Sequence, residues 1–313
     1  MLTRSQTKIA QSRWTLPATA IYVALLCVFI GMQTSQLWGQ VLLLGLSTLM
    51  LVELNNANSL IRIYSRMVSC SFLVMIIMSN FVIADIVSMA VVTAFVGFYL
   101  CFFKAYQNPT ATNHIFFAFF ALGIASIAFA QVLFLLPILW ILLATNVMAF
   151  SARTFFATLL GIASPYWFAA AYFIYVGDLS FFPRHFIELI QVGPMLDFTT
   201  IDEHRIVTAI FVAALAIIGA THFLMYSYLD KIRTRMIFEV FIVIDLCCFC
   251  LIILQPQHFD RLLGLAILTT SPLIGHYLAL SHTKISNICF YAIIVLALII
   301  TFYNLWMPLT IFS

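Results

Sequence analysis

Apolar runs of about twenty residues follow one another along almost the whole chain, separated by short polar segments. A helix rises about 1.5 Å per residue, so a run of this length spans the roughly 30 Å hydrocarbon core of a bilayer. Of the 313 residues, 64% are hydrophobic and only 8% are charged, whereas a soluble domain has about a quarter of its residues charged. Backbone groups in lipid must satisfy one another, and the runs do not alternate like barrel strands. The sequence therefore predicts an all-α, polytopic integral membrane helix bundle.

Eleven spans, forming a single transmembrane domain over residues 1–313, are predicted from the apolar runs. The first run follows Arg4, Lys8 and Arg13 like a signal peptide, but it is too long and no A-x-A site stands at its end, before Gln33, so we interpret it as a retained span. The stretches 67–103 and 114–150 fit either two full spans each or re-entrant segments. The predicted spans lie near 15–32, 37–54, 67–82, 84–103, 114–130, 132–150, 154–176, 206–228, 237–254, 262–281 and 285–306, with an extracytoplasmic loop at 177–205.

The basic residues predict the orientation, because cytoplasmic segments of membrane proteins are enriched in Lys and Arg. With the N-terminus in the cytoplasm, eleven of the fourteen Lys and Arg residues fall inside: Arg4, Lys8, Arg13, Arg62, Arg66, Lys104, Arg153, Lys231, Arg233, Arg235 and Lys284. Only Arg184, Arg205 and Arg261 fall outside. An odd number of spans then puts the C-terminus on the extracytoplasmic side.

Ionisable residues inside the predicted spans are the first candidates for function, because burying them in a membrane is costly. This intramembrane polar cluster comprises Glu53, His222, Glu239, Asp245 and His276, all in the cytoplasmic half of the predicted topology. In one interpretation, His222, Asp245 and His276 meet and form a proton relay or a ligand site in a cavity that faces the cytoplasm. In the other, an Asp–His pair simply bridges neighbouring helices.

A second set of candidates lies on the predicted outer side. Asp85, at the start of the fourth span, is a candidate general base for a lipid-linked substrate, or else a charge favoured by the helix dipole. Within the loop 177–205, one stretch has its apolar residues on one helical face, which is typical of a helix lying in the membrane interface. The loops on this side supply polar side chains that could bind a substrate phosphate, namely Arg184, His185, Asp202 and His204.

Other classes of site find little support in the sequence. A net charge of +3 is too small to indicate nucleic acid as a partner. The seven cysteines all lie in apolar runs and lack metal-ligand spacing, so they are interpreted as small hydrophobic residues. We predict no metal and no cofactor. Pro165 and Pro272 fall inside predicted spans and are expected to kink them.

Three segments carry a family resemblance: residues 103–108 (FKAYQN), 116–126 (FFAFFALGIAS) and 160–166 (LGIASPY), with residues 275–281 (GHYLALS) adding to it less clearly. They resemble an uncharacterised family of polytopic inner-membrane proteins from Bacteroidota. In layout that family is similar to polyprenyl-linked glycosyltransferases of the C fold and to O-antigen-type polymerases. Such glycosyltransferases keep an acidic residue in the first outer loop. The corresponding residues 33–36 here are QTSQ, without an acid.

Three functions remain open from the sequence. The resemblance implies a role in cell-envelope glycan or lipid-linked sugar assembly, with membrane lipids and a polyprenyl-linked glycan as partners. A non-catalytic membrane subunit, bound to other membrane proteins, is the second. A proton-coupled transporter of small molecules, using His222, Asp245 and His276, is the third.

Overall fold

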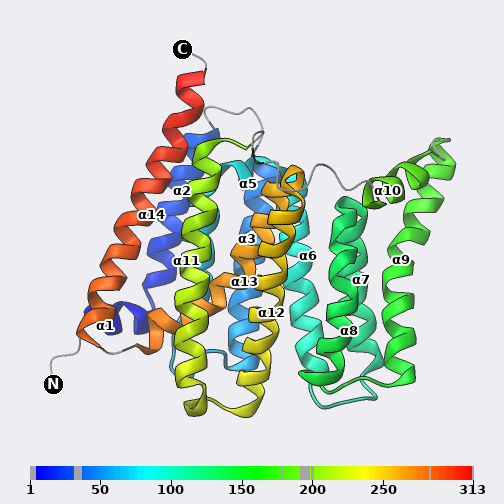
Figure 1. The fold of residues 1–313 in the computed structure, drawn as a ribbon, viewed down its shortest axis with the longest axis horizontal. Helices are drawn as coiled ribbons and strands as arrows, with labels where there is room; N and C mark the ends of the chain where they lie inside the picture. The colour runs from blue at the N-terminus through cyan, green and yellow to red at the C-terminus, as the bar shows by residue number, and fades with distance from the viewer. Residues whose placement is uncertain are drawn as a thin grey trace.

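In the computed structural model, successive helices run up and down between two ends of a bundle (Figure 1). The structure describes residues 5–31, 37–177, 180–190, 198, 201–281 and 283–311, and these contain no β-strand. The all-helical fold predicted from the sequence is therefore confirmed over the described residues.

Most helices follow the apolar runs, and four short 3-10 helices (η1 to η4) join or extend them. In chain order the elements are α1 (Ser5–Gln11), α2 (Thr15–Gly31), α3 (Trp38–Asn58), α4 (Met67–Met78), α5 (Asn80–Ala84), α6 (Ile86–Phe102), η1 (Phe103–Ala105), α7 (Thr112–Ala128), η2 (Ala130–Leu135), α8 (Leu136–Thr145), α9 (Ala152–Val176), α10 (Phe181–Ile190), α11 (Glu203–Tyr226), η3 (Ser227–Leu229), α12 (Ile232–Leu254), η4 (Pro256–His258), α13 (Phe259–Leu280) and α14 (Lys284–Ile311).

Among the described residues, seven helices are long and apolar enough to cross a membrane, and the pair α1 and α2, bent by 85°, makes an eighth if it counts as one span. Each predicted span contains a helix, but α4, α7 and the η2–α8 segment are shorter than the seven. The chain thus has the helices of a multi-pass membrane protein. Eleven crossings remain a prediction.

The break between α4 and α5 explains why the third predicted span is not one helix. Ser79 leaves the helical conformation, with φ −96° and ψ 64°. The side-chain amide of Asn304 on α14 donates to the Met78 carbonyl at 2.7 Å, and the Asn80 amide donates to the Asn304 carbonyl at 2.8 Å. A side chain from a distant helix therefore satisfies one backbone carbonyl next to the break, and a side chain at the break binds that helix in return.

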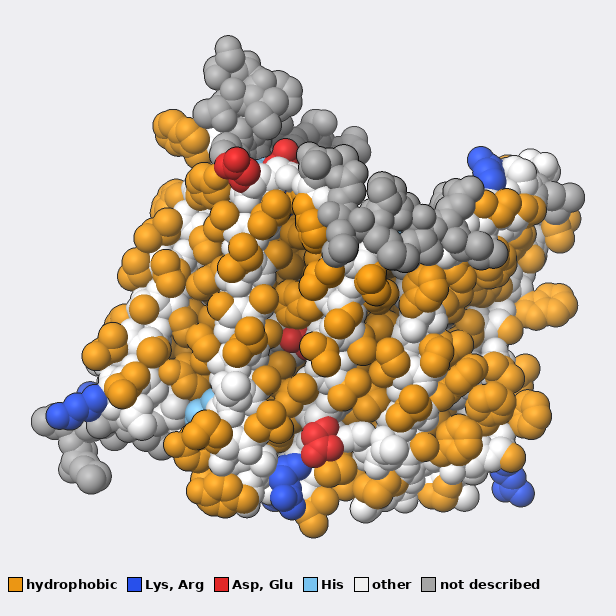
Figure 2. Space-filling model, in the orientation of Figure 1, with side chains coloured by type: hydrophobic (Ala, Val, Ile, Leu, Met, Phe, Trp, Pro, Cys, Tyr) orange, Lys and Arg blue, Asp and Glu red, His pale blue; other side chains and the backbone are white. Residues whose placement is uncertain are grey.

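The two ends of the bundle differ in charge. We call them the α1 end, with the turns at residues 59–66, 103–111, 146–151 and 227–231, and the α10 end, with η4 and the start of α11 (Figure 1). Described Lys and Arg residues at the α1 end are Lys8, Arg13, Arg62, Arg66, Lys104, Arg153, Lys231, Arg233, Arg235 and Lys284; those at the α10 end are Arg184, Arg205 and Arg261. Between the ends, the visible flank is covered mainly by hydrophobic side chains (Figure 2).

Helices α7 and α9 pack closely because each has a glycine against the other's backbone. A Cβ on Gly161 would lie 2.6 Å from the Phe116 carbonyl oxygen, and one on Gly123 would lie 2.8 Å from the Ile162 carbonyl oxygen. Both glycines begin the sequence GIAS, at residues 123–126 and 161–164, so the two copies of this sequence face each other. Small residues allow this approach between membrane helices, where packing replaces the hydrophobic effect.

We expect Gly161→Ala to lower the free energy of unfolding by about 2 kcal/mol, because the added methyl group overpacks the α7–α9 contact. Gly45→Ala on α3 is the matched control, since its added Cβ would have no atom within 4 Å. Unfolding in detergent, followed by circular dichroism, measures both. Equal stability of the two variants would contradict the close packing.

Candidate functional site

The polar candidates gather around α13, the most enclosed of the long helices. It packs against α4, α6, α11 and α12, and 94% of its membrane-length segment is buried inside the protein. Polar groups contact it at three levels. We call them the α1-end group (Arg62, His222, Asp230 and His276), the middle group (Asp245, Thr269 and Thr270) and the α10-end group (Asp85, Arg205, Asp260 and Arg261).

The α1-end group is built on a buried contact between Asp230 and His276. Asp230 Oδ2 lies 3.0 Å from His276 Nε2, with the two side chains 2% and 1% exposed. Asp230 follows η3 in the tight turn between α11 and α12, which points it back under α13. Arg62 Nη1 lies 3.9 Å from the other carboxylate oxygen, and the His222 ring centroid lies 5.7 Å from that of His276. Two histidines, one acid and one arginine thus meet at this end.

Beside this group lies a cavity of about 380 Å³, lined by Arg62, His222, Tyr226, Leu229, His276, Tyr277, Leu280, Ser281, Thr283, Ile285 and Ser286. The Nδ1 atoms of His222 and His276 are buried and have no hydrogen-bond partner among the described residues. Buried polar atoms are nearly always paired, with protein, water or ligand. The cavity therefore has the features of a site for a small polar molecule.

The middle group occupies the interior of the bundle. Asp245 on α12 is 5% exposed, and its Oδ1 accepts hydrogen bonds from the Thr269 and Thr270 hydroxyls at 2.6 and 3.0 Å. The Thr269 hydroxyl also lies within hydrogen-bond distance of the Leu265 and Ala266 carbonyls. A hydroxyl has one proton and two lone pairs. Thr269 can therefore donate to an ionised Asp245, or accept from a neutral one while donating to its own backbone.

The structure brings together only part of the predicted intramembrane cluster. The His222 and His276 rings are neighbours, with centroids 5.7 Å apart, but the acid beside them is Asp230 and not Asp245. Thr269, the partner of Asp245, precedes His276 by seven residues, or about 10 Å along the helix. Glu239 accepts a hydrogen bond from the Asn146 amide at 2.7 Å, and Glu53 is exposed on α3. The predicted relay of three residues is therefore two separate groups.

At the α10 end, two arginines pair with two aspartates. Arg205 Nη1 lies 2.9 Å from Asp260 Oδ2, and Arg261 Nε lies 3.4 Å from Asp85 Oδ2. They border a polar cavity of about 420 Å³ whose other lining residues are Ile201, Pro256, Gln257, His258 and Phe259. The Gln131 amide lies 2.7 Å from His258 Nε2, which links η2 to this cavity.

Asp85 acts as the N-cap of α6. Its Oδ1 accepts from the Val87 amide at 3.0 Å, and its Oδ2 accepts from the Ser88 amide and hydroxyl at 3.1 and 2.7 Å. Burial raises the pKa of this carboxyl. The hydrogen bonds from Ser88 and Val87 and the charge of Arg261 together lower the pKa by more than burial raises it, so it lies below the ordinary value. The structure gives Asp85 a structural task, and its catalytic role stays a prediction.

We expect Asp85→Ala to destabilise the protein by about 1 kcal/mol, the usual loss for an N-cap. Because the pKa of Asp85 is lowered in the folded state, its stabilising effect is full at neutral pH and is lost as the pH falls below about 4, through the folded pKa. Wild type and variant should therefore differ in thermal stability at neutral pH and converge in acid. A difference in thermal stability that persists in acid would contradict the N-cap role of Asp85. Asp85→Asn keeps a hydrogen-bond acceptor and should lose less stability than Asp85→Ala.

The four predicted substrate-binding residues lie in two places. Arg184 and His185 are on α10, where the Tyr166 hydroxyl of α9 lies 3.2 Å from His185 Nε2 and an Arg184 nitrogen lies 2.9 Å from the Ser180 hydroxyl. Asp202 and His204 begin α11, where the His204 ring meets the Phe81 ring of α5 edge-on at 5.9 Å. Asp202 borders the α10-end group through Arg205, at 3.4 Å. These contacts do not bring the four residues together into a single site.

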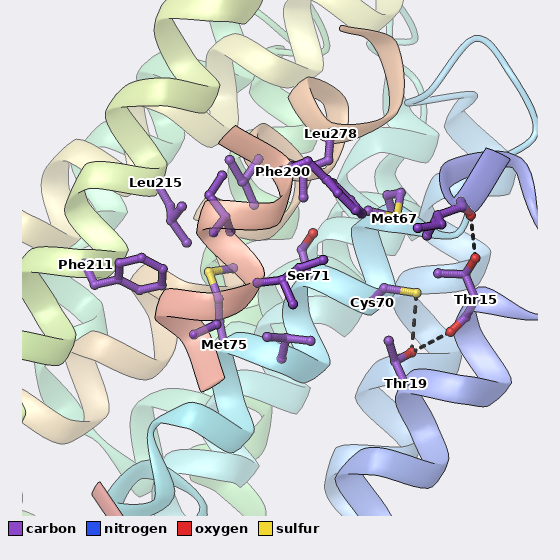
Figure 3. Close-up of a pocket in the computed structure, with 16 residues that line it drawn as sticks. Thr15, Thr19, Met67, Cys70, Ser71, Met75, Phe211, Leu215, Leu278 and Phe290 are labelled. Atoms are coloured by element: carbon purple, nitrogen blue, oxygen red, sulfur yellow. Dashed lines mark hydrogen bonds between the residues drawn. The ribbon is translucent and has the colours of Figure 1, made fainter. Parts of the chain in front are cut away.

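Two further hollows are apolar. One, of about 130 Å³, lies between α2, α4, α11, α13 and α14, and residues such as Met75, Phe211 and Phe290 line it (Figure 3). The Thr15 and Thr19 hydroxyls are already engaged, the second with Cys70 Sγ at 3.5 Å, whereas the Ser71 hydroxyl is buried and has no hydrogen-bond partner among the described residues. The other, of about 630 Å³, is a groove between η2, α8, α9 and α10, lined by residues such as Leu133, Trp167 and Phe186. Both suit hydrocarbon and not a polar ligand.

Asp230 is the residue of the candidate site that the sequence did not reveal. It stands in a short polar turn beside Lys231, where an acid is ordinarily solvated. The described residues contain no group of three or more His, Cys, Asp or Glu residues placed to hold a metal ion. Comparison with known protein families, with curated proteins and with solved structures finds no match for this chain.

Proposed function

We propose that this protein is a membrane carrier that couples the movement of a small polar solute to protons. The observation that carries the proposal is the position of Asp245 and of the Asp230–His276 pair against α13, away from lipid. Ionisable groups in a membrane interior are costly and are typical of proton and solute pathways. The α1-end cavity would receive the solute, and the middle group would carry the proton.

The geometry of the middle group suits a proton carrier. The Thr269 hydroxyl can donate to Asp245 Oδ1 when Asp245 is a carboxylate and accept from it when Asp245 is a neutral acid, so this hydrogen bond persists in both states. Pro272 lies between Thr270 and His276 and cannot donate to the Leu268 carbonyl. We infer that α13 bends at this point and so changes which end of the bundle can exchange protons with Asp245.

We further propose that the chain crosses the membrane eleven times, with the α1 end in the cytoplasm and the other end outside. The support is the concentration of Lys and Arg residues at the α1 end, together with the up-and-down course of the helices (Figure 1). The bacterial inner membrane is the location we propose.

Proton uptake into proteoliposomes tests the carrier proposal. The purified chain is reconstituted around a trapped pH-sensitive dye, and gradients of inorganic phosphate, succinate, glycine and glucose are applied in turn. We expect at least one gradient to change the internal pH faster than in protein-free liposomes. His276→Gln should slow the change, whereas Glu53→Gln, which alters an exposed acid, should not. Traces that match protein-free liposomes for every solute would contradict the proposal.

A role in lipid-linked sugar assembly is the second candidate, and one observation favours it. A polar cavity with Arg205 and Arg261 lies at the same end of the bundle as the amphipathic helix α10, which covers the apolar groove. Such an arrangement suits a lipid with an anionic head. Mass spectrometry of lipids that co-purify with the chain tests it: a polyprenyl phosphate retained by wild type and lost in Arg205→Gln would support this role, and its absence from wild type would count against it.

A further inference from the structure

We propose that the α1-end cavity binds a small anion through Arg62, His222 and a protonated His276, so that one proton is taken up with each anion. This inference rests on the proposed function, because it names the class of solute that the carrier would move. The ligand class is a small molecule bearing a carboxylate or a phosphate group. Three observations lead to it: the charge of the lining, the unpaired histidine nitrogens and the position of Asp230.

Basic and neutral groups line the cavity, and no carboxylate is among the described residues that line it. Arg62 is 38% exposed and uses only Nη1 in its contacts, at 3.9 Å from Asp230 and 3.4 Å from the Leu229 carbonyl. A guanidinium has five N–H groups, so most of its donors remain for a ligand. The arginine fork matches the oxygens of a carboxylate or a phosphate. A cation would find no such partner here.

His276 links anion binding to a proton. When its Nε2–H donates to Asp230, the neutral ring presents only a lone pair at Nδ1, which repels an anion. Nδ1 is buried in the structure, so a proton reaches it only when water enters beside the ring. The ring then becomes a cation with a donor at Nδ1, and the buried Asp230 carboxylate stabilises it. The proton returns to water when the anion leaves, so binding and protonation are coupled.

The groups around His276 are consistent with this coupling. Arg62 comes from the α3–α4 turn, His222 from α11, Asp230 from the α11–α12 turn, and Tyr277 from α13 itself. The positive Arg62 and the negative Asp230 balance each other, so protonation of His276 leaves the site with a net positive charge. The rings of Phe223 and Phe238, at 5.4 and 5.0 Å, keep the imidazole in an apolar enclosure. An anion then neutralises the charge.

The size of the cavity is also suitable. Its volume of about 380 Å³ lies at the small end of the range for small-molecule pockets, about 300–1,000 Å³. The hydroxyls of Ser281 and Ser286 line it as well, although both also bond to Gln6 of α1. A small organic acid or a phosphate fits these limits.

Binding of radiolabelled inorganic phosphate and succinate to the full chain in nanodiscs tests the inference, with choline as the cationic comparison. We expect saturable binding of at least one anion and none of choline. Arg62→Gln should weaken binding about tenfold or more, the loss of a charge-assisted hydrogen bond. Arg66→Gln is the matched control, because Arg66 belongs to the same turn but bonds to Asn56.

The coupling of anion binding to a proton is tested by measuring the binding affinity at about pH 6 and at about pH 8, which lie on either side of the ordinary histidine pKa. We expect wild type to bind the anion more tightly at the lower pH, and His276→Gln to lose this dependence. His222→Gln is the second variant if His276→Gln does not fold, and it should weaken binding at both pH values. Absence of saturable anion binding by wild type, or wild-type affinity in Arg62→Gln, would overturn the inference.

The two proposals fail separately. Proton movement driven only by glycine or glucose would leave the carrier proposal intact and refute the anion site. Anion binding without any solute-driven proton movement in proteoliposomes would leave the site intact and refute the carrier.

Discussion

Asp245→Asn is expected to slow solute-driven proton uptake by about a hundredfold, in the range for losing a positioned proton-transfer group. The amide oxygen of Asn can still accept the hydrogen bonds from Thr269 and Thr270, so the fold should persist. Asn cannot take up or release a proton, however, so the middle group loses its carrier. The internal dye in proteoliposomes measures the rate.

Two control variants separate this effect from a general loss of structure. Asp245→Glu retains the carboxyl group and should recover part of the rate, whereas Glu53→Gln removes an acid from an exposed position and should leave it unchanged. Wild-type rates in Asp245→Asn would show that the buried carboxyl takes no part in transport, and the pairing with Thr269 and Thr270 would then be purely structural.

Asp230→Ala is expected to destabilise the protein by about 3 kcal/mol, because removing one member of a buried polar pair leaves the other without compensation. His276 is 1% exposed and would lose its partner at Nε2, while Nδ1 is already unpaired among the described residues. Unfolding in detergent measures the loss.

Asp230→Asn is the matched comparison, since it keeps a hydrogen-bond acceptor at the same place and should destabilise the protein much less than Asp230→Ala does. Lys231→Gln changes the neighbouring charge in the same turn and should have little effect. If Asp230→Ala and Lys231→Gln have the same stability, the contact between Asp230 and His276 does not hold this end of the bundle together.

The helical architecture could be predicted because it depends on the length of the apolar runs. A run of about twenty residues must become a helix in a membrane, whatever its neighbours are. The gathering of Lys and Arg at one end is also a local property, since it follows from which polar turns they occupy. These features need no knowledge of how the helices face one another.

The composition of the site could not be predicted in the same way. Asp230 and Asp245 both lie between His222 and His276 in the sequence, but only the rotation of α12 and the course of the turn before it decide which acid reaches His276. The break at Ser79 likewise depends on Asn304, more than two hundred residues away. Such contacts depend on the packing of helices, which apolar run lengths do not encode.

The role of Asp85 could not be decided from the sequence. The sequence allowed a general base or a charge at a helix start, and the observed bonds to Val87 and Ser88 are those of the second. Only the backbone geometry of α6 could separate them, because an N-cap is defined by the amides it binds.

Infrared difference spectroscopy of the Asp245 carboxyl tests most directly whether the buried groups along α13 exchange protons. The chain in lipid is shifted between acidic and alkaline pH, and the carbonyl band of a protonated carboxylic acid is followed in wild type and in Asp245→Asn. The carrier account predicts a band in wild type that disappears at alkaline pH and that Asp245→Asn lacks. Identical difference spectra for the two proteins would mean that Asp245 keeps one protonation state, and would contradict the account.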